Sequence, residues 1–231
     1  MKAIKTLCAA ILAAGMLLTG CNSMTNTGKG ALIGGGGGGA LGAGIGALIG
    51  GGKGAAIGSG IGAAVGAGAG ALIGNRMDKQ AAKLKEQLAN ADVETVKDAN
   101  DLTAIKVTFP GGILFPTNGT TLSATAQTEL AQFAASLKEN PNTNVQIYGF
   151  TDNTGTMAVN QRVSTGRADS VLSFLAQCGI TPTRLSAQGV PMADYVATND
   201  TPAGRAQNRR VEIYVSADQE MIKQAEAGTL K

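Results

Sequence analysis

Glycine occupies every fourth position from Gly30 to Gly74, and this row limits what the N-terminal third of the chain can fold into. Lys53 is the one charged residue between Gly30 and Asn75. An almost uncharged stretch of Gly, Ala, Ile and Leu without aromatic side chains cannot build an ordinary soluble core. All 5 Phe and all 3 Tyr lie after residue 108. We therefore expect the folded soluble core in the C-terminal half.

The glycine row itself predicts a pair of membrane helices. On a helix, glycine at every fourth position leaves a ridge without side chains, along which membrane helices can pack closely. In water each helical Gly costs about 1 kcal/mol relative to Ala, whereas in hydrocarbon the backbone must satisfy its own hydrogen bonds. A span needs about 20 residues, which residues 31–51 and 54–74 each supply. We predict a glycine-zipper helical hairpin over residues 30–75.

Two other structures compete for the glycine segment. A flexible linker would be richer in Ser and would not repeat Ile, Leu and Val at fixed positions. A phosphate-binding loop would need a G-K-[ST] ending and a preceding strand, and neither is present.

The chain begins like a secretory signal peptide. Two lysines precede an apolar run over residues 7–18, and small residues lead to Cys21. The sequence Leu-Thr-Gly-Cys resembles the bacterial lipobox, in which the Cys is acylated and becomes the new N-terminus. We predict a signal peptide over residues 1–20 and a lipidated tether over 21–29. The following Asn22 favours the outer over the inner membrane, because an Asp there favours inner-membrane retention in lipoproteins.

Composition excludes several classes of function. The chain has no His and no Trp, which removes Ser-His-Asp and Cys-His catalysis and His-based metal sites. Its formal net charge of +3 is too small and too dispersed for a nucleic-acid-binding surface. We expect no catalytic residues, no cofactor, no metal and no nucleic-acid partner.

The C-terminal part reads as an α+β domain over residues 103–216. Apolar periodicity predicts a mixed sheet with helices on one face, in the order β-α-β-α-β-β. The expected strands are 103–109, 144–150, 184–188 and 211–215, and the expected helices are 123–139, capped by Ser123, and 157–177. Residues 76–102 are predicted to be a connecting helix and linker, and residues 217–231 a C-terminal tail.

One face of the predicted helix 157–177 carries an arginine where a core residue is expected. Asn160, Ser164 and Arg167 share this face with Val171. A charge directed toward a core needs a partner, and the nearest candidate in sequence is Asp152, which follows the preceding strand. The pair could be a structural salt bridge. Alternatively, it could bind a zwitterion, with Asp152 accepting an ammonium and Arg167 holding a carboxylate.

A family resemblance rests on these motifs. The chain has Gly149-Phe-Thr-Asp-Asn-Thr-Gly155, then Asn160-x-x-Val-Ser-x-x-Arg167-Ala-x-x-Val171, and finally Gly204-Arg-Ala-Gln-Asn-Arg-Arg-Val-Glu-Ile213. Together they closely resemble the OmpA-like peptidoglycan-binding domain. With the lipobox and glycine zipper, the chain resembles OmpA-family outer-membrane lipoproteins of the YiaD type.

The resemblance implies a set of ligand-binding residues. Asp152 and Arg167 would clamp the amino-acid end of diaminopimelate in the stem peptide of the cell wall. Asn160 and Arg209 would make secondary contacts, and Asn118 would contribute from a loop. That loop departs from the family pattern, which usually has Asp where this chain has Pro116.

The resulting hypothesis is a tether between membrane and cell wall. Acylated Cys21 and residues 30–75 would hold the bilayer of the outer membrane, while the periplasm-facing domain would bind peptidoglycan without making or breaking bonds. The alternative is a glycine-zipper homo-oligomer that acts as a membrane pore or envelope-stress factor, with wall binding only locating it. A stator-like transducer would want an intramembrane carboxylate, which residues 30–75 lack.

Overall fold

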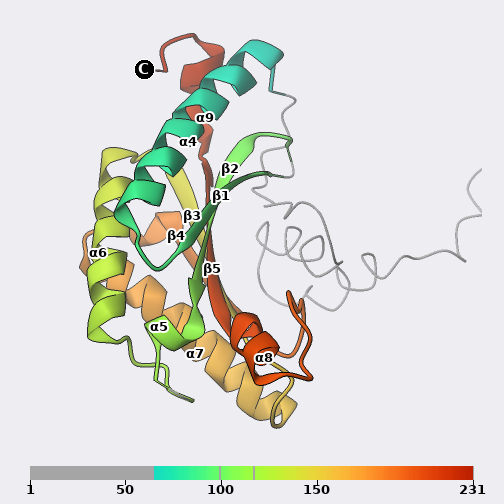
Figure 1. Cartoon of the computed structure of the whole chain (residues 1–231). Coiled ribbons are helices and arrows are strands. Elements are labelled where there is room, and N and C mark those ends of the chain that lie inside the picture. The colour runs from blue at the N-terminus through green and yellow to red at the C-terminus, as the bar shows by residue number, and fades with distance from the viewer. Residues whose placement is uncertain (1–64, 99, 117, 231) are drawn as a thin grey trace, which may run out of the picture.

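The computed structural model describes residues 65–98, 100–116 and 118–230 (Figure 1). Its strands form one five-stranded sheet in the order β1-β2-β5-β3-β4. The elements are α4 (Ala67–Gln87), β1 (Asp92–Lys97), β2 (Thr103–Pro110), α5 (Gly111–Leu114), α6 (Ala124–Glu139), β3 (Thr143–Phe150), α7 (Met157–Gln177), the 3-10 turn η1 (Pro182–Arg184), β4 (Leu185–Val190), α8 (Pro202–Asn208), β5 (Arg210–Ala217) and α9 (Gln219–Glu226).

The sheet is mixed, as predicted. Strands β3 and β4 are parallel because α7 crosses over between them, while the pairs β1–β2, β2–β5 and β5–β3 are antiparallel. The register places Val145 opposite Val215 and Ile147 opposite Ile213. Because side chains alternate along a strand, these four all point to the same face of the sheet.

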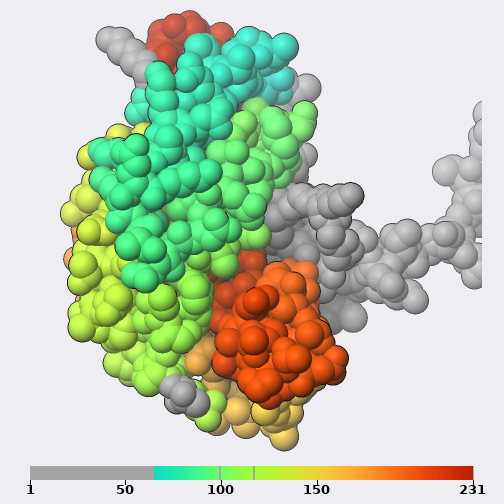
Figure 2. Space-filling view, viewed as in Figure 1, coloured from blue at the N-terminus to red at the C-terminus, as the bar shows by residue number. Residues whose placement is uncertain are grey.

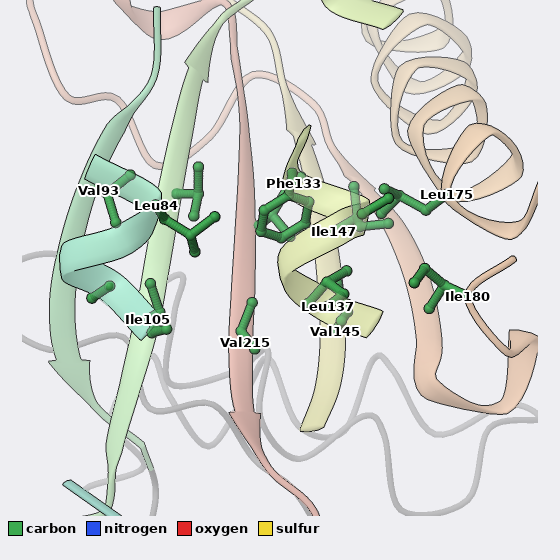
Figure 3. Close-up of a cluster of buried hydrophobic side chains, with 14 of the residues drawn as sticks. Leu84, Val93, Ile105, Phe133, Leu137, Val145, Ile147, Leu175, Ile180 and Val215 are labelled. Carbon is green, nitrogen blue, oxygen red and sulfur yellow. The ribbon is translucent and has the colours of Figure 1, made fainter. Parts of the chain in front are cut away.

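The core lies between that face and the long helices. Leu84 of α4, Phe133 and Leu137 of α6 and Leu175 of α7 meet the sheet residues there, and Figure 3 shows them converging. Leu84, Phe133, Leu137 and Leu175 are fully buried. A smaller cluster on the opposite face includes Tyr148 and Tyr214. The expected arrangement, with helices on one face of a mixed sheet, is confirmed.

The predicted helix starts follow from their caps. Ser123 precedes α6 and its Oγ accepts a hydrogen bond from the Ala126 N–H at 3.0 Å. Thr156 does the same for α7 through the Val159 N–H at 3.4 Å. A cap of this kind satisfies one of the N–H groups that a first helical turn leaves without a partner.

The structure corrects the prediction at the end of the glycine segment. Helix α4 begins at Ala67, inside the predicted hairpin 30–75, and Ala69 and Ile73 are buried in the core of the domain. Packing of α4 against the sheet offsets the free energy that the glycines of α4 cost the helix. Among the described residues, no helix has the length and apolar character needed to cross a membrane. The rest of the predicted hairpin, residues 30–64, lies outside the described residues, as do the signal peptide and the lipid site.

The expected linker and tail also belong to the folded unit. Residues 76–102 contain the rest of α4 and strand β1, which pairs with β2 at the edge of the sheet. Residues 217–231 contain α9, whose Met221, Ile222 and Ala225 are buried. The hydrophobic core therefore extends beyond the predicted boundaries 103–216 at both ends.

Candidate functional site

Three segments meet at one end of the molecule, where β3 ends and α7 and β5 begin (Figure 1). Helix α7 can approach the sheet closely because glycines face it. A Cβ on Gly149 would lie 2.3 Å from the Ser164 carbonyl oxygen, and one on Gly189 would lie 2.5 Å from the Ser164 Oγ. Real Cβ atoms do not come this close, so the two glycines fix the depth at which α7 sits.

Asp152 lies just past the end of β3 and is buried. Its Oδ1 accepts a hydrogen bond from the Thr154 N–H at 2.9 Å, and its Oδ2 accepts one from Arg209 Nη1 at 2.5 Å. Burial alone would raise the pKa of Asp152, but the hydrogen bonds and the charge of Arg209 outweigh it and lower that pKa. The carboxylate is therefore ionised across the neutral and mildly acidic range.

Arg167 lies on the buried face of α7, as its spacing predicts, and its residue surface is 4% exposed. Its Nε donates to the Gly119 carbonyl at 3.0 Å, and its guanidinium carbon lies 5.2 Å from the centre of the Phe115 ring. Its two terminal nitrogens donate to no other residue in the described part of the chain. Burial and the charge of Arg209 lower the pKa of Arg167, which Asp152 partly opposes.

The salt-bridge alternative for Asp152 and Arg167 is wrong. Asp152 forms its ion pair with Arg209, which lies between α8 and β5 and is distant in sequence. Sequence spacing could not reveal this pair, because the contact depends on β5 lying beside β3 in the sheet. Arg209 lowers the pKa of Arg167 and Asp152 raises it. The two terminal nitrogens of Arg167 make no hydrogen bond to the described residues.

Asn160 lies one helical turn into α7 and is buried. Its Nδ2 donates to the carbonyls of Thr154 and Thr156 at 2.8 and 3.1 Å. These bonds hold the turn between Asp152 and α7. Asn160 therefore supports the Asp152 loop, and its contact with a ligand stays a prediction.

Asn118 is exposed and adopts a positive φ of 57°. The neighbouring Gly119 supplies the carbonyl that holds Arg167. The structure therefore brings the predicted loop residue to the edge of the site, one residue from the Arg167 contact. Phe115 and Gly119 are the supports that sequence reasoning missed, since neither bears a side chain that binds small polar ligands.

A further missed element is the loop that follows β4. The Asn208 side chain accepts from the Val196 and Ala197 N–H groups at 2.9 and 3.0 Å. Thr151 Oγ1 accepts from the Met192 N–H at 3.0 Å. These bonds tie the loop to the ends of β3 and α8. Asn208 stands within the motif quoted above, but only the fold shows what its amide holds.

The same loop places an aromatic side chain beside the site. Arg210 stacks on Phe150 at 3.8 Å and donates to the Asp194 carbonyl at 3.0 Å. The next residue, Tyr195, is 41% exposed. Slight burial and the charge of Asp152 raise the pKa of Tyr195.

Taken together, the site presents a buried carboxylate and a buried guanidinium fork. Comparison with known families agrees with this layout. Residues 114–209 match the OmpA family, and residues 1–78 match the YMGG-like Gly-zipper. The matched segment contains Asp152, Arg167 and Arg209, the three charged residues of the site.

The chain is similar to curated proteins over part of its length. The chain is 38% identical to the probable lipoprotein YiaD of Escherichia coli K12, over 61% of this chain and 63% of that protein. It is 37% identical to the peptidoglycan-binding protein ArfA of Mycobacterium bovis, over 49% of this chain and 35% of that protein. The chain thus spans less than two thirds of the length of these relatives.

A solved structure gives the same fold. The cell wall anchor of the T6SS from Pseudomonas aeruginosa superimposes with a TM-score of 0.51 at 31% identity. The match covers 62% of this chain and 98% of that one. The OmpA-like fold expected from the sequence motifs is therefore confirmed.

Proposed function

We propose that this protein tethers the outer membrane to the cell wall by binding peptidoglycan non-covalently. The observation that carries the proposal is the state of Arg167. Its guanidinium is buried and positioned by Gly119 and Phe115, yet its terminal nitrogens have no partner among the described residues. A buried guanidinium held in this way is prepared for a carboxylate, which it can bind through two parallel hydrogen bonds.

The ligand that fits is the free amino-acid end of diaminopimelate in the stem peptide. Its carboxylate would bind Arg167, and its ammonium would bind Asp152. Each carboxylate oxygen has two lone pairs, so Asp152 can accept the ammonium while keeping its bonds to Thr154 and Arg209. The two relatives named for a peptidoglycan-binding protein and a cell wall anchor support this ligand class.

The chemistry of the site suits binding rather than catalysis. The charged groups around Asp152 are arginines, and the nearby hydroxyl of Ser164 is buried and donates to the Gln161 carbonyl. The Thr154 hydroxyl lies beside the Asp152 carboxylate, but the lowered pKa of Asp152 and its bonds to the Thr154 N–H and to Arg209 make that carboxylate a weak base. We therefore propose a non-enzymatic role.

The membrane end of the proposed tether rests on sequence. Acyl chains on Cys21 and the glycine-zipper segment 30–64 would hold the bilayer, and several chains together anchor firmly where one anchors marginally. The match to the YMGG-like Gly-zipper and the likeness to a lipoprotein support this assignment. Outer-membrane location with the domain facing the periplasm follows from Asn22 and from the need to reach the wall.

Co-sedimentation with insoluble sacculi tests the proposal. The full chain should sediment with sacculi, and a soluble stem peptide containing diaminopimelate should release it. The same peptide with lysine in place of diaminopimelate lacks the side-chain carboxylate and should release it poorly. Equal release by both peptides would contradict the zwitterion clamp. A chain that forms oligomers and ignores sacculi would instead favour the membrane-pore alternative.

Asp152→Asn provides the matched variant. Asparagine keeps the shape and the hydrogen bond from the Thr154 N–H, but it removes the charge that would attract an ammonium. We expect sacculus binding to fall by about 30-fold or more, in line with the loss of one partner of a desolvated charge pair. Wild-type affinity of this variant would show that the carboxylate does not bind the ligand.

A further inference from the structure

A groove of about 400 Å³ lies between α4, the end of α6 and the C-terminal segment. A neighbouring hollow of about 490 Å³ shares Arg76, Asn140 and Leu230 with it. Figure 2 shows α4 and the C-terminal segment together at the top of the molecule, whereas α8 lies at the bottom. The groove and the Asp152 site are therefore at opposite ends, and volumes of this size are typical of small-molecule sites.

The groove carries both signs of charge. Arg76, Lys79 and Lys83 follow one another at i, i+3 and i+7 on one face of α4, so all three line it. Glu139 lines the groove from α6 and forms an ion pair with Lys83 at 2.5 Å. A ligand with an anionic group beside a cationic one would complement this lining.

Gln80 adds an acceptor without a partner. It lines the groove, and only 4% of its surface is exposed. Its Nε2 donates to Ser136 Oγ at 3.3 Å, whereas its buried Oε1 receives no hydrogen bond. A buried carbonyl oxygen in this position requires an N–H or O–H donor, and the groove is where a ligand could supply one.

The surroundings of the groove are apolar on the side where the chain enters. Leu72 lines the groove and is 40% exposed, and Leu230 lines it from the C-terminal segment. Leu72 lies just over one helical turn after the start of α4 at Ala67. The glycine segment 30–64 directly precedes that start in the sequence.

We infer that this groove binds the headgroup of a zwitterionic phospholipid that carries a primary ammonium. The phosphate binds Lys79, and the ammonium donates to Gln80 Oε1 and to Glu139. Leu72 and Leu230 face the glycerol and the start of the acyl chains. The headgroup contact would fix the orientation of the domain on the membrane, with the Asp152 site directed away from the bilayer.

The position of the groove favours a lipid over a free phosphate or amino acid. A free ligand would gain nothing from the exposed Leu72 and the partly buried Leu230, whereas a lipid covers both. This inference rests on the membrane-anchoring part of the proposed function and not on wall binding. Failure at the groove would therefore leave sacculus binding untouched.

Titration of the full chain in a nonionic detergent with soluble headgroups tests the inference. Glycerophosphoethanolamine should bind about tenfold more tightly than glycerophosphocholine, because the choline nitrogen has no N–H to give Gln80. Gln80→Leu should abolish this preference, and Lys79→Glu should weaken binding of both headgroups about tenfold. Lys85→Glu, also exposed on α4 but outside the groove lining, should change nothing.

The comparison between headgroups needs no variant, so misfolding cannot obscure it. Equal affinity for the two headgroups would overturn the inference, as would inorganic phosphate binding as tightly as glycerophosphoethanolamine. All three variants should bind sacculi like the unchanged chain, which also shows that they are folded. If Lys85→Glu weakened headgroup binding as much as Lys79→Glu, the contact would be a diffuse charge effect and the specific site would be wrong.

Discussion

Replacing Arg167 by lysine is the most informative change at the wall-binding site. Lysine keeps the positive charge and can reach toward the Gly119 carbonyl that now accepts from Nε at 3.0 Å. It lacks the planar fork that places two donors in line with one carboxylate. The substitution therefore separates charge from geometry, which a change to alanine does not.

The magnitude follows from what Arg167 would give up. A single ammonium cannot satisfy the Gly119 carbonyl and grip both oxygens of a ligand carboxylate, so at least one charge-assisted hydrogen bond is lost. Such a bond contributes about 1.5–3 kcal/mol, which corresponds to a loss of affinity of about 10- to 150-fold. The stacking on Phe115 at 5.2 Å weakens as well, at a cost of about 1 kcal/mol.

The assay is sacculus co-sedimentation over a range of protein concentrations, with thermal unfolding measured on the same samples. A stability loss of about 1 kcal/mol should lower the melting temperature by only about 2–4 °C, so the variant remains folded while its binding falls. Arg162→Lys is the matched control, because Arg162 lies on the same helix and is exposed. It should bind like the unchanged chain.

One result would refute the reasoning. If Arg167→Lys bound sacculi as tightly as the unchanged chain, a bidentate grip on a carboxylate would not be the basis of recognition. If binding fell equally in the Arg162→Lys control, the loss would follow from replacing any arginine of α7 and not from the lost fork of the buried guanidinium.

Three other predictions concern acidity, packing and lipidation. The pKa of Asp152 is lowered from its ordinary value of 3.8. Its contribution to sacculus binding should therefore be full between pH 7 and pH 5 and be lost as the pH falls through the folded-state pKa. A loss of binding with its midpoint between pH 5 and 7 would implicate another group. Gly149→Ala would place a Cβ 2.3 Å from the Ser164 carbonyl oxygen. This variant should lower the free energy of unfolding by about 1–3 kcal/mol, measured by chemical unfolding. The control Gly112→Ala has open space around it and should be close to neutral. Cys21→Ala should abolish metabolic labelling by a palmitate analogue, and equal labelling of both proteins would disprove acylation at this residue.

Much of the fold could be predicted from the sequence because its central elements carry strong periodic signals. Strands β2, β3 and β5 alternate or run apolar through the centre of the sheet, and helix α7 begins and ends at the predicted residues. Local interactions define such elements, since a cap or an apolar stripe depends on nearby residues alone. The same periodicity gave the order of helices and strands along the chain, whereas Asp152 and Arg167 came from the helix face and the family motifs.

The elements that sequence reasoning missed depend on contacts with distant segments. Strand β1 has only Val93 fully buried, and it becomes a strand because β2 offers a free edge for pairing. The first half of α4 contains glycines that disfavour a helix in water, and its helical state depends on Ala69 and Ile73 packing into the core. Local propensity could not reveal either interaction.

At the candidate site, the sequence determined which chemical groups are present, and the tertiary structure decided how they are paired. Asp152 and Arg167 were identified from their motifs and from the place of a charge on a core-facing stripe. Their separation into an Asp152–Arg209 ion pair and a guanidinium held by Gly119 came only from the fold. The reason is physical: β5 lies beside β3 in the sheet and brings Arg209, the residue just before β5, to Asp152, so the closest charge in sequence is not the closest charge in space.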